Sequence, residues 1–107
     1  MKGEALKGHL DLILLAALEA GPTYGYSIAA RVASATGGNV TLSDGTIYTA
    51  LHRLEHAGLL TSRYMTSKGR RRRVYSLTDR GWQESARLRR EWWDFARGLE
   101  VLLQPGR

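Results

Sequence analysis

The chain has 107 residues, enough for one compact domain and too few for two. Its 16 Lys and Arg outnumber its 10 Asp and Glu, and the net charge of +6 favours an anionic partner, either a nucleic acid or a membrane surface. The absence of cysteine excludes disulfides, thiolate metal sites and a cysteine nucleophile.

The first third of the chain predicts two helices. Apolar residues recur at the spacing of one helix face at Leu10, Ile13, Leu14, Ala17 and Leu18. Gly21-Pro22 ends this helix, and Thr23 can then cap a second helix that ends near Gly37-Gly38. The β-branched pair Val40-Thr41 favours a short extended connection to the next element.

A third helix is predicted from Ser43 to about Ala57. Ser43 is a good N-cap, Asp44 in the first turn suits the helix dipole, and Gly58 is a C-terminal stop. The apolar spacing predicts an inner face made of Ile47, Leu51 and Leu54. The opposite face then presents Gly45, Tyr48, Thr49, His52 and Arg53.

This outer face has the chemistry of a DNA reader. Arg53 can read guanine edges or grip phosphates, Thr49 can contact a thymine methyl group, and the Tyr48 hydroxyl can bond a phosphate. Gly45 leaves the start of the helix open, so a phosphate or a base edge could approach the backbone N–H groups. An amphipathic helix with a merely solvated polar face is the alternative interpretation, and the basic segment that follows argues against it.

A basic β-hairpin is predicted after the third helix. Leu59–Tyr64 and Arg72–Leu77 have the character of strands, with a turn at Ser67-Lys68-Gly69. Lys68 and the run Arg70–Arg73 gather positive charge at the hairpin tip. Alternate residues of a strand point to opposite faces, so Arg70 and Arg72 should share one face, and Arg71 and Arg73 the other.

The repulsion within this cluster costs stability unless counter-charges are supplied, and DNA phosphates would supply them. The inward pair of arginines could instead lie along the edge of the core or pair with an acid such as Glu55. A charged edge that protects the sheet against aggregation is the alternative interpretation.

The last segment predicts one long helix. Thr78 can cap it, and a helix that continues to Leu103 covers about 26 residues, or about 39 Å. An apolar stripe at helical spacing comprises Leu88, Trp92, Phe95, Leu99 and Leu102. Trp93 points about 100° away from this stripe, so the two indoles together widen the apolar surface.

A small domain cannot bury such a helix, which predicts a homodimer. The first helix of the partner, around Leu10, Ile13 and Leu14, would complete the interface. Simple packing of the aromatic stripe is one interpretation. A pocket at the dimer axis, where an indole of Trp92 or Trp93 stacks on a planar molecule, is the sharper one.

These segments together resemble the PadR family of winged-helix transcriptional regulators. The resemblance covers almost the whole chain and rests on the segments Gly25–Ile28, Ser43–Glu55, Gly58-Leu59 and Arg72–Thr78, and on Gly81. The length is similar to that of the short subfamily, which has a single C-terminal helix. The resemblance implies a homodimer joined through its first and last helices that usually represses promoters. In some members a planar aromatic compound binds at the dimer centre against a tryptophan of the last helix, a position that Trp92 or Trp93 would match.

Two residues of the segment Ser43–Glu55 differ from what the family or DNA binding favours. The family often has proline after the tyrosine of this motif, and this chain has Thr49, which implies changed DNA contacts on the same fold. Asp44 places an acid where a phosphate is expected near the helix start, so it either weakens DNA affinity slightly or serves only as a cap.

We therefore predict a mainly α winged helix-turn-helix of order α-α-α-β-β-α, with a DNA-binding domain at 1–78 and a dimerisation helix at 79–107 in one compact unit. The expected partners are double-stranded DNA, a second copy of the chain and a small planar aromatic effector, without a cofactor or metal. The residues expected to contact DNA are Ser43, Gly45, Thr46, Tyr48, Thr49, His52, Arg53, Lys68, Arg70, Arg71, Arg72 and Arg73. The alternative is a winged-helix module that binds a protein or ligand without specific DNA binding.

Catalytic and metal sites are not supported by the sequence. His52 and His56 stand one helical turn apart but lack an obvious third ligand for zinc. Ser43 and His52 have no third group to orient them as a nucleophile and its base. Gly37-Gly38 lacks the spacing of a phosphate-binding loop, so we expect a protein that is not an enzyme.

Membrane association is also disfavoured. The longest uncharged apolar run, Leu12–Leu18, is too short to cross a bilayer, and the N-terminus lacks the pattern of a signal peptide. The arginines lie on a predicted hairpin and not beside an amphipathic apolar face, which argues against a membrane-surface protein. We expect a cytoplasmic location.

Overall fold

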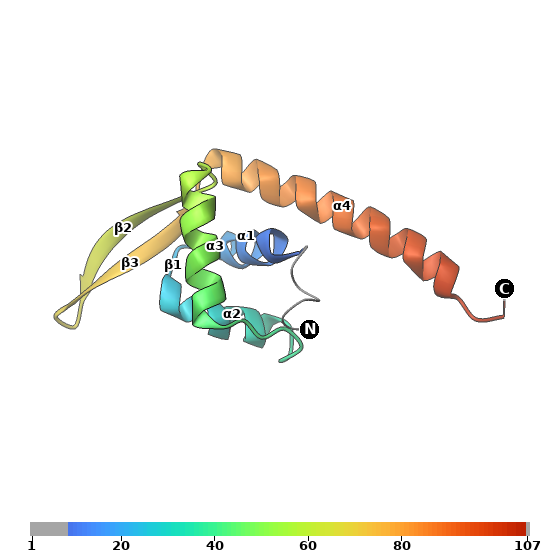
Figure 1. The fold of residues 1–107 in the computed structure, drawn as a ribbon, viewed down its shortest axis with the longest axis horizontal. Helices are drawn as coiled ribbons and strands as arrows, with labels where there is room; N and C mark the ends of the chain where they lie inside the picture. Colours follow the sequence, from blue (N-terminus) through green and yellow to red (C-terminus); the bar gives the residue numbers. More distant parts are fainter. Residues whose placement is uncertain (1–8, 107) are drawn as a thin grey trace.

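The computed structural model of the protein describes residues 9–106. Its elements are α1 (Leu10–Glu19), β1 (Thr23–Tyr24), the 3-10 turn η2 (Gly25–Ser27), α2 (Ile28–Ala35), α3 (Asp44–His56), β2 (Leu60–Ser67), β3 (Arg70–Leu77) and α4 (Asp79–Leu103). The molecule measures 61 × 27 × 21 Å, because the hairpin of β2 and β3 and the long α4 project from opposite sides of the helical body (Figure 1). The predicted mainly α winged helix-turn-helix is confirmed, with one additional short strand.

The core lies around α1, which packs against α2, α3, β3 and α4. Its buried side chains are Leu14, Leu15, Leu18, Ile28, Val32, Ile47, Ala50, Leu51, Leu54, Leu60 and Tyr75. The predicted inner face of α3 is confirmed, since Ile47, Leu51 and Leu54 are at most 1% exposed. Leu15 lies outside the predicted apolar stripe of α1 and is nevertheless fully buried, because α1 is covered on several sides.

Two predicted helix starts are confirmed by hydrogen bonds. At the start of α3, Ser43 Oγ accepts a hydrogen bond from the Thr46 N–H at 3.2 Å. At the start of α4, Thr78 Oγ1 accepts one from the Gly81 N–H at 3.0 Å. Gly58, which follows the end of α3, has a φ of 82°, in the left-handed region that favours glycine.

The helix cap predicted at Thr23 is wrong. Thr23 and Tyr24 form β1, which pairs antiparallel with β3, so that Thr23 lies opposite Tyr75 and Tyr24 opposite Val74. The sheet order is β1-β3-β2, and α2 begins only at Ile28. A β-branched residue followed by an aromatic one suits a strand, but the partner strand lies far along the chain, beyond the reach of local sequence signals.

The connection between α2 and α3 contains no strand at Val40-Thr41. Val40 instead packs against the core, and its N–H donates a hydrogen bond to Thr36 Oγ1 at 3.1 Å. The side chain of Thr36 thus holds the connection against the end of α2, which a pattern of β-branched residues does not reveal.

The basic hairpin is longer than predicted. Its strands pair in continuous register from Leu60 opposite Leu77 to Ser67 opposite Arg70. The turn is the pair Lys68-Gly69, with φ values of 52° and 74°, and two positive φ values are the backbone of a tight turn that matches the twist of paired strands. The predicted strand limits at Tyr64 and Arg72 are therefore wrong, and the whole arginine run lies within a hydrogen-bonded strand.

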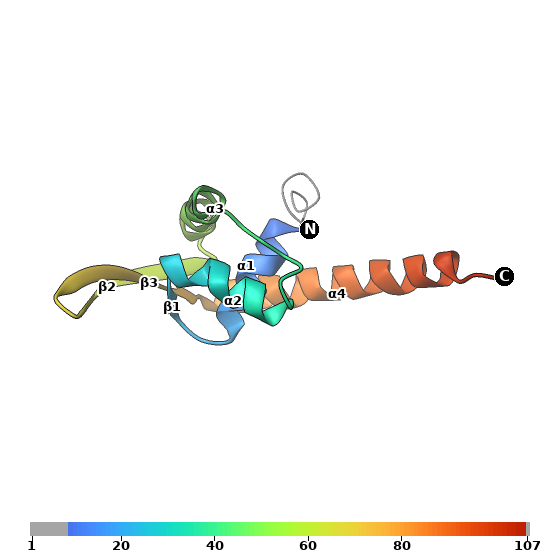
Figure 2. The ribbon, with the colours of Figure 1, turned by 90° about the horizontal axis from the view of Figure 1, so that it is seen from below.

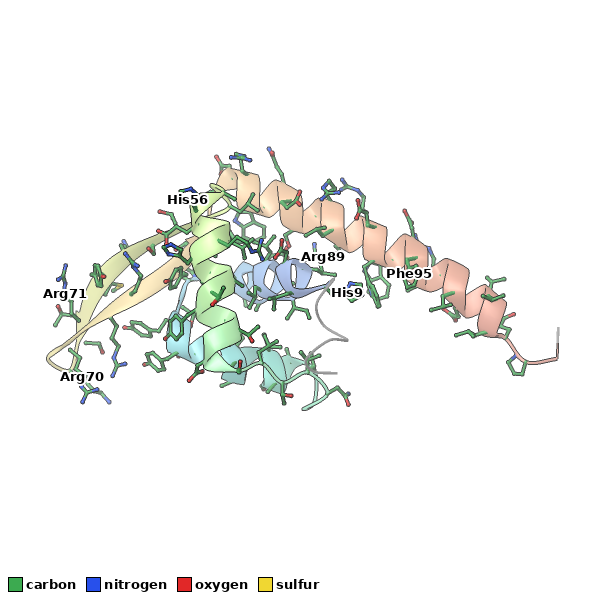
Figure 3. The ribbon with its side chains drawn as sticks, viewed as in Figure 1. His9, His56, Arg70, Arg71, Arg89 and Phe95 are labelled. Carbon is green, nitrogen blue, oxygen red and sulfur yellow. The ribbon has the colours of Figure 1, made fainter. Side chains whose placement is uncertain are left out.

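The long last helix is confirmed, with 25 residues that end at Leu103. Near its start, buried Ser85 donates a short hydrogen bond to Glu19 of α1, and Glu19 also pairs with Arg89 at 2.6 Å. Figure 3 shows Arg89 beside α1 and Phe95 farther along α4, beyond the N-terminal end of α1 near His9. The rest of α4 continues away from the body, and Val101, Leu102 and Leu103 are at least 67% exposed.

Candidate nucleic-acid interface

The outer face of α3 is open to solvent. Figure 2 shows α3 end-on, at one flank of the body and directed across the line of α4. A Cβ added at Gly45 would meet no atom within 4 Å, so the start of the helix is unobstructed. The hydroxyl of Ser43, besides capping the helix, donates to Thr46 Oγ1 at 2.9 Å. The other predicted contact residues of α3 are all exposed: Tyr48, Thr49, His52 and Arg53.

Tyr48 is held from behind by the turn that precedes α2. A Cβ at Gly25 would lie 2.8 Å from Cε1 of Tyr48 and 3.3 Å from Cε2 of Tyr75, so only glycine allows this close packing. The Tyr48 side chain stays 45% exposed while one edge of its ring is supported. Gly25 and its neighbour Tyr26 are absent from the site predicted from sequence, although the motif Gly25–Ile28 contained the signal.

The hairpin carries the entire charge excess of the protein. The segment Leu60–Leu77 contains Arg63, Lys68 and the run Arg70–Arg73, and no Asp or Glu. Basic and acidic residues balance in the rest of the chain. The ion pairs of the described residues involve α1, α3 and α4, and none includes a cation of the hairpin. These cations are therefore available to an external polyanion.

Tyrosine rings support the arginines of the hairpin. The guanidinium carbons of Arg71 and Arg73 lie 4.2 Å and 4.9 Å from the ring centroid of Tyr64, which faces Arg73 across the hairpin. On the other face, Arg72 lies 4.6 Å from the ring centroid of Tyr26. The predicted alternation of faces is thus confirmed, and Figure 3 shows Arg70 and Arg71 on opposite sides of the hairpin. Stacking limits the motion of these side chains while their charges stay unneutralised.

Polar contacts attach the base of the hairpin to α3. Glu55 of α3 accepts a hydrogen bond from the Ser62 hydroxyl of β2 at 2.6 Å, so Glu55 does not form the ion pair with an arginine that the sequence suggested. Burial raises the pKa of Tyr75, against a hydrogen bond with Arg73 that lowers it. The Ser62–Glu55 hydrogen bond joins β2 to α3 and so orients the hairpin relative to α3, whereas the Arg73–Tyr75 contact lies within β3.

Arg53 has an acidic partner that the sequence did not suggest. Its Nη2 lies 2.5 Å from Oδ1 of Asp11 in the first turn of α1, and its Nη1 lies 3.3 Å from Oδ2. The hydrogen bond to Asp11 is the main cause that raises the pKa of Arg53. In this structure the guanidinium is therefore directed toward α1 rather than away from the body.

A cavity of about 570 Å³ lies between α1, α3 and α4. It is lined by His9, Leu10, Asp11, Leu12, Arg53, Leu88, Glu91, Trp92 and Phe95. The ring centroids of His9 and Trp92 lie 5.2 Å apart in an edge-to-face contact, and those of Trp92 and Phe95 lie 5.9 Å apart. Trp93 does not line this cavity and is 52% exposed. Trp92 therefore lines the cavity, whereas the neighbouring Trp93 faces solvent.

The predicted interface set needs one correction. Leu14 is fully buried in the core of its own chain and offers no surface to a partner, because α1 is covered there by the other helices. Leu10, Ile13 and Leu88 are partly buried and stay partly accessible. Phe95 and Leu99 are 57% and 38% exposed.

The histidines of α3 do not form part of a metal site within the described residues. His52 and His56 are exposed, and residues 9–106 contain no group of three or more potential metal ligands. No helix in this part of the chain has the length and apolar character needed to cross a membrane.

The sequence matches the profile of the "Transcriptional regulator PadR-like family" over residues 14–87. This match spans most of the chain, from α1 through the first turns of α4, and includes both α3 and the hairpin. The chain belongs to the PadR-like family. Membership places it among transcriptional regulators and not among enzymes.

Solved structures of transcriptional regulators share this architecture. A transcriptional regulator from Clostridium thermocellum is 26% identical, with a TM-score of 0.84 over 95% of this chain and 100% of that chain. A PadR family transcription regulator from Clostridium difficile is 32% identical, with a TM-score of 0.79 over 91% of this chain and 100% of that chain. Bacillus subtilis PadR, solved in complex with operator DNA, is 28% identical, with a TM-score of 0.65 over 73% of this chain and 45% of that chain.

Proposed function

We propose that this PadR-like protein is a homodimeric regulator that binds a pseudo-palindromic operator and represses transcription. Residues 1–78 would bind DNA and 79–107 would form the dimer. The observation that carries the proposal is the position of the whole charge excess on a hairpin beside the open face of α3. The operator complex of the Bacillus subtilis relative supports DNA as the partner. An action on DNA also agrees with the expected cytoplasmic location.

In this proposal α3 enters the major groove and the hairpin lies on the adjacent backbone. Tyr48, Thr49 and His52 would face base edges or phosphates, while Gly45 allows the close approach of a phosphate to the helix start. Each arginine that neutralises a phosphate also releases condensed counterions, which favours binding at low salt.

The apolar end of α4 supports the dimer. Phe95, Leu99 and Leu102 are exposed in the single chain, and contiguous apolar surface of this kind marks an interaction site. A second copy that packs its α4 against α1 and α4 near Leu10 and Ile13 would cover it. The two-fold axis would then place two α3 helices about 34–36 Å apart, one turn of DNA.

Release by a small planar aromatic effector is part of the proposal. The cavity walls include the rings of His9, Trp92 and Phe95, which suits a planar aromatic compound. Quenching of tryptophan emission by such compounds tests the pocket. A Trp82→Phe variant removes the indole at the start of α4, so the remaining emission comes from Trp92 and Trp93. Compounds that leave this emission unchanged contradict the pocket.

The hairpin tests DNA binding most directly. Arg70 and Arg72 share one face of the hairpin, and Arg72 lies over Tyr26 of the turn behind α3, so Arg70→Ala with Arg72→Ala is the informative variant. We expect it to weaken binding to duplexes of different sequence alike, and to reduce the salt slope by about one unit per lost phosphate contact. The measurement is fluorescence anisotropy with labelled duplexes selected from a random library by the wild-type protein.

The matched control is Arg87→Ala with Arg90→Ala, which removes the same charge from exposed positions of α4, away from the proposed DNA surface. It should leave the salt slope unchanged. Equal losses in both variants would point to a nonspecific effect of net charge. If selection enriches no sequence, the alternative of a winged-helix module without specific DNA binding is correct.

A further inference from the structure

Arg53 is the only Lys or Arg in α3, and it already forms an ion pair with Asp11 of α1. It belongs to the exposed face that carries Gly45 and Thr49 at a spacing of four residues, and these three residues line one shallow groove. Its two guanidinium contacts to Asp11 form a fork-like pair. The principal cation of the recognition helix is therefore neutralised within the free protein.

We propose that Asp11 competes with DNA for Arg53 and thereby lowers the DNA affinity of the regulator. This inference rests on the proposed function. In the free protein the Asp11 carboxylate accepts the hydrogen bonds of Arg53. On DNA a phosphate, or the O6 and N7 atoms of a guanine, accepts them instead, and the Asp11 carboxylate returns to water.

The Arg53–Asp11 ion pair is weak enough for a DNA group to replace Asp11. The side chains of Arg53 and Asp11 are 55% and 39% exposed, and ion pairs with this exposure are weak because water competes for both charges. A phosphate presents the same two-point geometry to a guanidinium as a carboxylate does. The Arg53 side chain can rotate away from Asp11 and still lie along the groove that Gly45 and Thr49 line. The exchange therefore requires no movement of the backbone.

A different contact already anchors α1. Glu19, at the other end of α1, binds both Ser85 and Arg89 of α4, and the Glu19 side chain is only 20% exposed. The core residues Leu14, Leu15 and Leu18 hold the same helix. Loss of the Asp11 contact should therefore leave the fold intact.

The test measures operator affinity after removal of the Asp11 charge. We expect Asp11→Asn to tighten binding about two- to fivefold, the range that loss of an exposed ion pair allows. In an Arg53→Ala background the same substitution should have no effect, because the group that it releases is missing. Glu84→Gln breaks an ion pair with Arg87 near the start of α4 and removes the same charge, so it serves as the control and should leave affinity unchanged.

Unchanged or weaker binding by Asp11→Asn overturns the proposal. Tightening that persists in the Arg53→Ala background also overturns it. Asp11 would then act only through long-range repulsion between its charge and the DNA phosphates. Asp11→Ser must reproduce the tightening, with thermal unfolding as the check on folding. A wild-type protein that binds no duplex contradicts the proposed function itself, which is a different result from failure of the Asp11 variants.

Discussion

At the scale of single residues, Gly81 allows the start of α4 to pack closely against Leu59, because glycine has no side chain. A Cβ at this position would lie 2.1 Å from the carbonyl oxygen of Leu59, a distance that no side chain tolerates. The same carbonyl accepts a hydrogen bond from the Thr78 N–H at 3.2 Å. The start of α4 can therefore approach the end of α3 only with glycine at this position.

Gly81→Ala should lower the free energy of unfolding by about 1–3 kcal/mol, since the added methyl group forces α4 away from Leu59. Gly98→Ala is the matched control. It makes the same change in the same helix where no atom lies within 4 Å, and it should stabilise the protein by up to about 1 kcal/mol through helix propensity. Urea denaturation at one protein concentration measures both. Effects of the same sign would contradict this account.

Glu19 gives stability a dependence on pH. Burial alone would raise its pKa, but the hydrogen bonds from Ser85 and Arg89 together lower the pKa below the ordinary value of 4.5. A lowered pKa in the folded state stabilises the fold above about pH 4.5, and this contribution disappears as the pH falls through the lowered value.

Glu19→Gln should therefore reduce the loss of unfolding free energy between pH 7 and pH 3. Glu100→Gln removes a carboxylate that is exposed and near the end of α4, so it should leave the acid sensitivity close to that of the wild type. Chemical denaturation at both pH values measures the difference. An acid sensitivity in Glu19→Gln that equals the wild-type value would show that the contact with α4 does not depend on this charge.

At the scale of elements, α3 divides its residues between folding and recognition. Ile47, Leu51 and Leu54 are buried, while Tyr48 and Thr49 face solvent. Changes on the outer face should therefore alter recognition without unfolding the helix.

Thr49→Ala should reduce the preference for operator over random duplex by roughly 1–3 kcal/mol if Thr49 makes a direct base contact. Competition binding against unrelated DNA measures this preference, and circular dichroism checks that helicity is retained. Gln83→Ala, on the exposed start of α4, should leave the preference unchanged. Loss of helicity in the Thr49→Ala protein would show that the faces of α3 are wrongly assigned.

At the scale of the whole molecule, the far end of α4 is not covered by any other element among residues 9–106. The molecule is 61 Å long, and the apolar residues at the end of α4 are at least 67% exposed. In the proposed dimer, a second copy of the chain buries these apolar residues. The spacing of the two α3 helices, and hence of the operator half-sites, would follow from this packing.

Phe95→Glu should convert the dimer to monomers, or unfold it, because the seam would then contain two buried charges. Sedimentation equilibrium measures the mass, and DNA binding should weaken in parallel as the two half-sites become uncoupled. Gln83→Glu adds the same charge to the exposed start of α4 and should leave the dimer intact. A well-folded wild-type monomer at high concentration would contradict the dimer.

Features that depend on neighbours along the chain could be predicted from the sequence. The caps at Ser43 and Thr78, the inner face of α3 and the order of the four helices and the hairpin follow from hydrogen-bonding side chains and apolar periodicity within a few residues. The charge of the hairpin and the length of α4 are equally local properties. Most of the candidate site could therefore be identified before the fold was known.

Contacts between residues far apart in sequence became known only from the folded structure. It paired Thr23 and Tyr24 with β3, enclosed Leu14 and Leu15 in the core, and directed Arg53 to Asp11. It also placed Tyr26 beneath an arginine of the hairpin. Each of these contacts joins segments that are far apart in sequence, so their energies depend on packing and pairing partners that local propensity and periodicity do not contain.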